Sequence, residues 1–182
     1  MESLENVRLN TEKLHMTPAN VDFAEDIFYA LNDEITKFLS FPTPKSIDET
    51  IEFLQENEDN IRAGKSITFA ALRRDNDEFV WNCWIEDITT GRPKLWMRVA
   101  LEQGWNKFGT DMVRALIRWY FEKYNNDFMI YQVDENNRPS VHIARNKIDA
   151  ECVRGPFEQE QEKDTWNILK ILEYRVYGPE RI

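Results

Sequence analysis

The chain has 182 residues, enough for one domain with a full hydrophobic core and few for two, so we expect a single domain over residues 1–182. The net charge of -10 argues against a broad surface for nucleic acid or for anionic membranes. The chain has no long apolar run, no signal-peptide pattern and no cysteine framework. We therefore expect a cytoplasmic protein that binds a small-molecule ligand or amine substrate, with no nucleic-acid or membrane partner and an oligomeric state that stays open.

The first half of the chain has the pattern of one strand followed by three helices. Apolar spacing predicts them over residues 7–16, 23–31, 33–39 and 46–64. Ser46 and Glu49 have the spacing of a capping box, which marks the start of the third helix.

The second half is richer in strands. They are predicted over residues 67–72, 78–85, 95–101, 128–133 and 168–177, with helices over 108–124 and 140–146. The polar residues 73–77 suit a hairpin turn between the first two of these strands. This order predicts an α/β fold of the α+β type, with a mixed sheet of about six or seven strands and helices on both faces.

The segment from Gln103 to Asp111 is a strand exit, a tight loop and the start of an amphipathic helix. Such a place can hold a pyrophosphate on backbone N–H groups that have no partner in the helix. The loop normally needs glycines, because they let the backbone approach the anion. Here Trp105 and Lys107 stand where small residues are expected.

Several short segments carry a family resemblance. They include Ala24-Glu25-Asp26-Ile27-Phe28, Phe41-Pro42-Thr43-Pro44, Gly109-Thr110-Asp111, Ala115-Leu116-Ile117-Arg118-Trp119 and Asn137-Arg138-Pro139-Ser140. In this order and spacing, over about residues 7 to 150, they resemble the GNAT superfamily of N-acetyltransferases. The most similar branch acetylates the N-termini of ribosomal proteins and related amines.

The resemblance implies the GNAT-like acyl-CoA N-acyltransferase fold and acetyl-CoA as cofactor. In that family the strand before the long helix parts from the next strand and receives the pantetheine arm, and an amine attacks the thioester directly. The resemblance implies a cofactor site at Val99, Gly104, Lys107, Gly109, Thr110, Asn137 and Ser140.

The chain departs from the family at positions that usually hold glycine. These are Trp81, Trp84, Trp96, Trp105, Lys107 and Ile148. Bulky residues there predict a remodelled cleft, in a diverged relative or an engineered variant, that is weak or inactive in acetyl transfer and binds acetyl-CoA weakly or takes no cofactor. The alternative is an active N-acetyltransferase, acting on a protein N-terminus or a small amine, that accommodates these residues by moving its loop.

Each of these residues also has a simpler interpretation. The indoles of Trp81, Trp84 and Trp96 form either an aromatic pocket for a flat ligand or ordinary core. Lys107 either pairs with a phosphate or is a solvated loop residue.

Three residues are candidates for catalysis. Glu86 is placed to act as a base or is a solvated strand end, and Tyr131 is a proton donor or a core residue. His142 either forms a nucleophilic pair with a cysteine or Ser140, or lies on the surface. No cluster of histidine, cysteine and carboxylate residues has metal-ligand spacing, so no metal site is expected.

Overall fold

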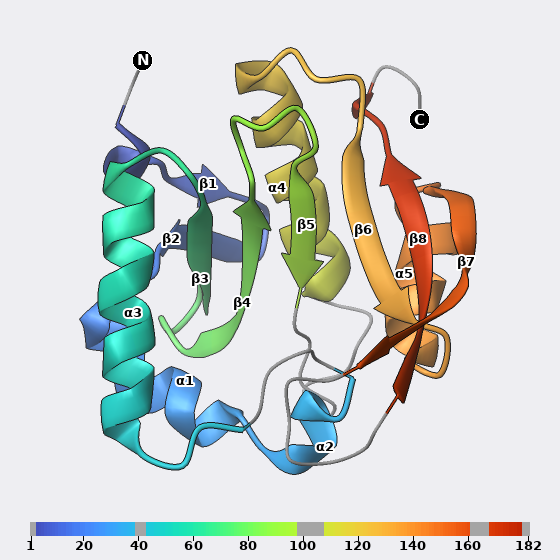
Figure 1. Ribbon diagram of the computed structural model, residues 1–182. Coiled ribbons are helices and arrows are strands. Elements are labelled where there is room, and N and C mark those ends of the chain that lie inside the picture. The colour runs from blue at the N-terminus through green and yellow to red at the C-terminus, as the bar shows by residue number, and fades with distance from the viewer. Residues whose placement is uncertain (1–2, 39–42, 98–107, 161–167, 180–182) are drawn as a thin grey trace.

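The computed structural model describes residues 3–38, 43–97, 108–160 and 168–179, and its centre is an 8-stranded sheet (Figure 1). Its strands are β1 (Leu9–Asn10), β2 (Leu14–Pro18), β3 (Ile67–Arg73), β4 (Phe79–Glu86), β5 (Lys94–Met97), β6 (Met129–Asp134), β7 (Glu151–Glu160) and β8 (Ile168–Val176). They lie in the order β1-β2-β3-β4-β5-β6-β8-β7. Only β5 and β6 pair in parallel among the described strands.

Helices cover both faces of this sheet (Figure 1). They are α1 (Ala24–Ala30), α2 (Asp33–Thr36), α3 (Ile47–Arg62), α4 (Gly109–Lys123) and α5 (Arg138–Asn146), with short 3-10 turns η1 (Leu4–Asn6) and η2 (Val21–Phe23). The helices α1 and α3 lie on one face, and α4 and α5 lie on the other. None of the helices in the described ranges is long and apolar enough to cross a membrane. The predicted mixed sheet with helices on both faces is therefore confirmed.

The start of α3 follows the predicted capping box in part. The Ser46 hydroxyl accepts a hydrogen bond from the Glu49 backbone N–H at 3.3 Å. The Glu49 carboxylate accepts from the Lys45 backbone N–H at 2.8 Å, one residue before the cap. Further along, Leu54 and Asn57 belong to the buried face of the helix, where the Asn57 side chain donates to the Ala19 carbonyl at 2.9 Å. These contacts fix α3 on one face of the sheet, over β3.

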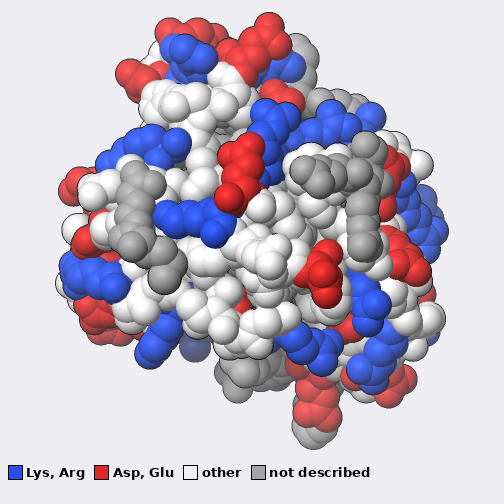
Figure 2. Space-filling model, turned by 90° about the horizontal axis from the view of Figure 1, so that it is seen from above, with Lys and Arg blue, Asp and Glu red and all other residues white. Residues whose placement is uncertain are grey.

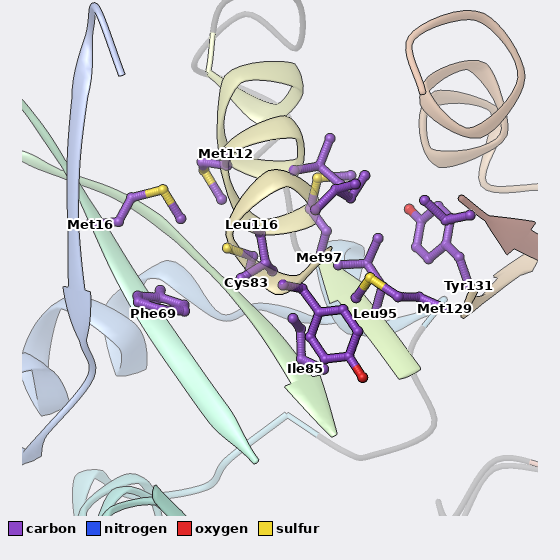
Figure 3. Close-up of a cluster of buried hydrophobic side chains, with 14 of the residues drawn as sticks. Met16, Phe69, Cys83, Ile85, Leu95, Met97, Met112, Leu116, Met129 and Tyr131 are labelled. Atoms are coloured by element: carbon purple, nitrogen blue, oxygen red, sulfur yellow. The ribbon is translucent and has the colours of Figure 1, made fainter. Parts of the chain in front are cut away.

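The larger core lies between the sheet and α4 (Figure 3). Alternate residues of β3 and β4 point into it, so Phe69 and Cys83 are fully buried opposite Leu116. The ring of Phe69 meets Trp119 of α4 edge to face, with centroids 5.7 Å apart. This packing sets the position of α4 on the sheet.

Two strand predictions differ from the structure. Residues 7–16 form a hairpin instead of one strand, because the Thr11 hydroxyl accepts from the Leu14 N–H at 2.9 Å and closes a turn between β1 and β2. The strand β7 has no predicted counterpart. Most of its residues are exposed and do not alternate in polarity, and it is held by its pairing with β8.

Candidate functional site

The sheet opens where β5 meets β6. The described residues of these strands pair as Lys94 with Ile130 and Leu95 with Tyr131. β6 continues to Asp134 without further pairs to the described part of β5. We call this junction the β5–β6 seam. A parallel pair that ends early leaves backbone groups of both strands free to meet a ligand.

The first turn of α4 lies beside the seam, at the end of β5 (Figure 1). No described side chain caps this turn, although α4 is 15 residues long. Its free backbone N–H groups and the helix dipole therefore favour an anion. The basic residues nearby are paired with carboxylates, since Lys13 lies 3.8 Å from Asp111 and Arg73, whose guanidinium is 5.9 Å from the centre of the Phe108 ring, pairs with Asp75 and Glu78. The residues Gly109 and Thr110 of this turn are buried.

The predicted pair Asn137 and Ser140 forms the N-terminal cap of α5. The Asn137 side chain accepts a hydrogen bond from the Ser140 backbone N–H at 3.3 Å. This cap explains the spacing of the two residues and leaves the Ser140 hydroxyl free for another contact. Ser140 is buried, on the same side of the sheet as Tyr131 of β6.

Tyr131 occupies the last described pair of the seam, opposite Leu95. Its side chain is enclosed between the sheet and the helices (Figure 3), and among the described residues its hydroxyl has no partner at hydrogen-bond geometry, although the Ser140 side chain lies next to it. Burial raises the pKa of Tyr131 to about 12, although the neighbouring Ser140 side chain lowers it in part. The group is therefore protonated at neutral pH.

This raised pKa makes the protein less stable in alkali. Because the native state holds the Tyr131 proton up to about pH 12 and the unfolded chain releases it near 10, the free energy of unfolding should fall as pH rises through this window. The slope from one group is at most ~1.4 kcal/mol per pH unit. Tyr131→Phe should flatten the fall, as measured by denaturant unfolding between these pH values. The control is Tyr29→Phe on the exposed Tyr29, and equal slopes in wild type and Tyr131→Phe would contradict the assignment.

The tryptophans predicted to line one aromatic pocket lie on opposite faces of the sheet. Trp81 packs in the core under α4 together with Leu116, so it takes the core role. Ile148 is likewise buried in this core. Trp84 of β4 and Trp96 of β5 form a cross-strand pair, and their indoles stack at 5.8 Å with an interplanar angle of 13°. Successive residues of a strand face opposite sides, which separates Trp81 from this pair.

Glu86 lies at the end of β4 and accepts hydrogen bonds from both indoles of the stacked pair. The N–H of Trp84 is 3.0 Å from Oε1, and the N–H of Trp96 is 2.9 Å from Oε2. The carboxylate is thus fixed in place by two neutral donors and is half-buried. It lies on the face of the sheet that α3 covers in part.

The other candidates for nucleophilic chemistry lie apart. His142 is exposed on α5, and its ring contacts the Asn146 side chain at 3.1 Å. Cys83 is buried in the core, where desolvation raises the pKa of its thiol, while Cys152 is exposed on β7. The contacts of the described residues do not bring a histidine to Ser140 or to either cysteine. The described ranges also contain no group of three or more residues able to hold a metal ion.

Four of the site residues predicted from the sequence lie outside the described residues. They are Val99, Gly104, Trp105 and Lys107.

A pocket that the sequence did not indicate opens between α3 and the strands β3, β4 and β5. Its volume is about 410 Å³, and it is lined by residues that include Phe53, Glu56, Trp84 and Glu86. Phe53 is an aromatic residue of α3 that is exposed in the structure. The one signal available in the sequence was this aromatic side chain beside the apolar spacing of the predicted helix. Basic and acidic side chains are interspersed on the end of the molecule seen in Figure 2, so this end has no broad patch of a single charge.

Comparisons with known proteins agree on one family. The model of the acetyltransferase (GNAT) domain matches residues 13–146. Among solved structures, an acetyl transferase from Salmonella typhimurium that modifies the N-terminal serine of the 50S ribosomal subunit protein L7/L12 is similar with a TM-score of 0.78 and 12% identity, over 94% of this chain and 99% of that one. A putative ribosomal-protein-serine acetyltransferase from Vibrio cholerae is similar with a TM-score of 0.75 and 15% identity, over 96% of this chain and 99% of that one.

A third similar structure is the ribosomal L7/L12 alpha-N-protein acetyltransferase in complex with coenzyme A. It gives a TM-score of 0.77 and 13% identity, over 94% of this chain and 98% of that one. At such identities the likeness concerns the fold alone. No curated protein sequence matches the chain significantly.

Proposed function

Because the chain belongs to the GNAT acetyltransferase family, which confirms the resemblance seen in its sequence, we propose that it is an acetyl-CoA-dependent N-acetyltransferase acting on a protein N-terminus or a small amine. The observation that carries the proposal is the β5–β6 seam beside the uncapped first turn of α4. The expected remodelled or engineered cleft finds no support in these comparisons. Of the bulky residues held responsible, Trp81 and Ile148 are core residues.

The residues of this chain fit the cofactor. Gly109 and Thr110 would hold the pyrophosphate on the backbone N–H groups of the α4 first turn. The free backbone edges of the seam would bind the pantetheine arm. Bound acetyl-CoA supplies an activated thioester.

Two side chains near the seam can serve the proton transfers. Tyr131 sits at the end of the pairing, so its position makes it the best placed of the three catalytic candidates to donate a proton to a leaving thiolate, although its raised pKa makes it a weaker acid than a free tyrosine. The Ser140 hydroxyl, its neighbour, can relay that proton. His142 is exposed on the outer side of α5, and Glu86 is better suited to binding than to proton abstraction because both of its oxygens already accept a hydrogen bond from an indole N–H.

The function can be tested with pairs of probes that differ only in whether their amines are free or acetylated. A peptide with a free N-terminal serine and the same peptide acetylated at its N-terminus are each mixed with acetyl-CoA and the protein, and free thiol is followed. A parallel set uses 1,5-diaminopentane and its diacetylated form. We expect calorimetric binding of acetyl-CoA and release of thiol with a free amine only. Folded protein that binds no acetyl-CoA and releases no thiol with either free amine would contradict the proposal and favour the remodelled cleft.

A further inference from the structure

The pocket between α3 and the sheet combines an apolar wall with a fixed negative charge. Phe53 of α3 and Trp84 of β4 supply the aromatic surface, and Phe53 is 43% exposed although it faces this space. A pocket of about 410 Å³ is in the range of small-molecule sites. Aromatic faces of this kind bind methylene groups and attract cations.

The charges that line the pocket leave an acidic excess. Its carboxylates are Glu56, Glu86 and Asp87, and its ammonium groups are Lys65 and Lys94. Lys94 lies opposite Glu86 in the strand register, but its ammonium group pairs with Asp87 at 3.1 Å. No lysine or arginine in the described ranges forms an ion pair with Glu86.

Glu86 is therefore a half-buried carboxylate that is held in position by two indoles and pairs with none of the described lysines and arginines. The indoles of Trp84 and Trp96 donate one hydrogen bond to each of its oxygens, which orients it and leaves further lone pairs open. A fixed, partly desolvated charge binds an opposite charge more strongly than a solvated one does. Its natural complement is an ammonium group.

The stacked indoles connect this pocket to the seam. Trp84 lines the pocket, and its partner Trp96 stands on β5, the strand that borders the seam. A flexible aliphatic chain lying along the indoles would reach from the carboxylate toward the place where β5 and β6 part. We propose that the acceptor is a small aliphatic diamine or polyamine, whose distal ammonium group binds in this pocket against Glu86 while its other amine is acetylated. This inference rests on the proposed function.

Three probes of equal length and a single differing end test this proposal. They are 1,5-diaminopentane, n-pentylamine and 5-aminopentanoate, which carry a distal ammonium, methyl and carboxylate group. Binding is measured by calorimetry and by tryptophan fluorescence without acetyl-CoA, and acetyl transfer by thiol release. We expect the diamine to bind about 10-fold or more tightly than pentylamine, with aminopentanoate the weakest. The same order should hold for kcat/KM.

Variants locate the effect. Glu86→Gln should reduce the preference for the diamine over pentylamine to about 2-fold or less, and Glu56→Gln should reduce it in part. Glu52→Gln, on an exposed position of α3 outside the pocket lining, is the matched control and should keep the wild-type ratio. Circular dichroism and the unfolding midpoint check that each variant is folded. Glu56→Gln, on the outer part of α3, tests the pocket if Glu86→Gln does not fold.

The outcomes separate this inference from the proposed function. If Glu86→Gln and Glu56→Gln leave the diamine preference unchanged, the pocket assignment is wrong, whatever the activity. A loss of kcat with both amines at a constant ratio would likewise overturn it and make Glu86 catalytic. A preference in binding that depends on Glu86, with no thiol release from any amine, would contradict the acetyltransferase function and leave the binding site standing.

Discussion

Thr110→Asp should lower the affinity for acetyl-CoA by about 100-fold, or ~2.8 kcal/mol. Thr110 is buried in the first turn of α4, where no described side chain satisfies the backbone N–H groups. A carboxylate there would occupy those N–H groups itself and repel a pyrophosphate. The substitution keeps nearly the same side-chain volume, and a negative charge in the first turn of a helix is favourable to folding. Calorimetric titration of the folded variant with acetyl-CoA measures the loss.

The matched control is Thr110→Asn, which has the shape of aspartate without the charge. It should keep most of the affinity, and the gap between the two variants should narrow as salt is added. An equal loss in both variants would mean that shape at this position matters and the helix terminus does not. Unchanged binding in Thr110→Asp would place the cofactor elsewhere.

Phe69→Ala should lower the free energy of unfolding by about 3 to 5 kcal/mol. The ring of Phe69 is fully buried between β3 and α4 and packs edge to face on Trp119 at 5.7 Å, so its removal leaves a cavity under the helix that carries the candidate anion site. Urea denaturation measures the change. Tyr29→Ala removes a comparable ring that is 77% exposed on α1 and should cost far less. Similar losses in the two variants would show that the ring of Phe69 carries no special packing energy.

Long periodic segments could be predicted from the sequence alone. The helix of residues 108–124 and the strands of 67–72 and 78–85 match α4, β3 and β4 closely, because each has one face buried in the core and a polar or covered opposite face. The strand β7 escaped prediction since its residues gain their stability from pairing with β8, which a local pattern does not express.

The arrangement of the site was harder to predict than the elements. Trp81 and Trp84 are three positions apart on one strand, so strand alternation alone places them on opposite faces and rules out a common pocket. The stack of Trp84 on Trp96 depends on the register between β4 and β5, which sequence spacing does not fix. Likewise, Asn137 and Ser140 owe their spacing to a helix cap, a structural need that is independent of cofactor binding.

The short parallel pairing between β5 and β6 divides the sheet into two antiparallel blocks, β1 to β5 and β6 to β8. The strands within each block are joined by antiparallel hydrogen-bond ladders, whereas the described pairing across the boundary consists of two register positions. Opening at this boundary breaks few of the described hydrogen bonds, so the two blocks are joined there mainly by the core that they share. Acetyl-CoA bound there, as proposed, would contact both blocks, and its occupancy would be thermodynamically linked to opening at the boundary. The ligand-free protein should then open at this boundary more readily than the ligand-bound protein.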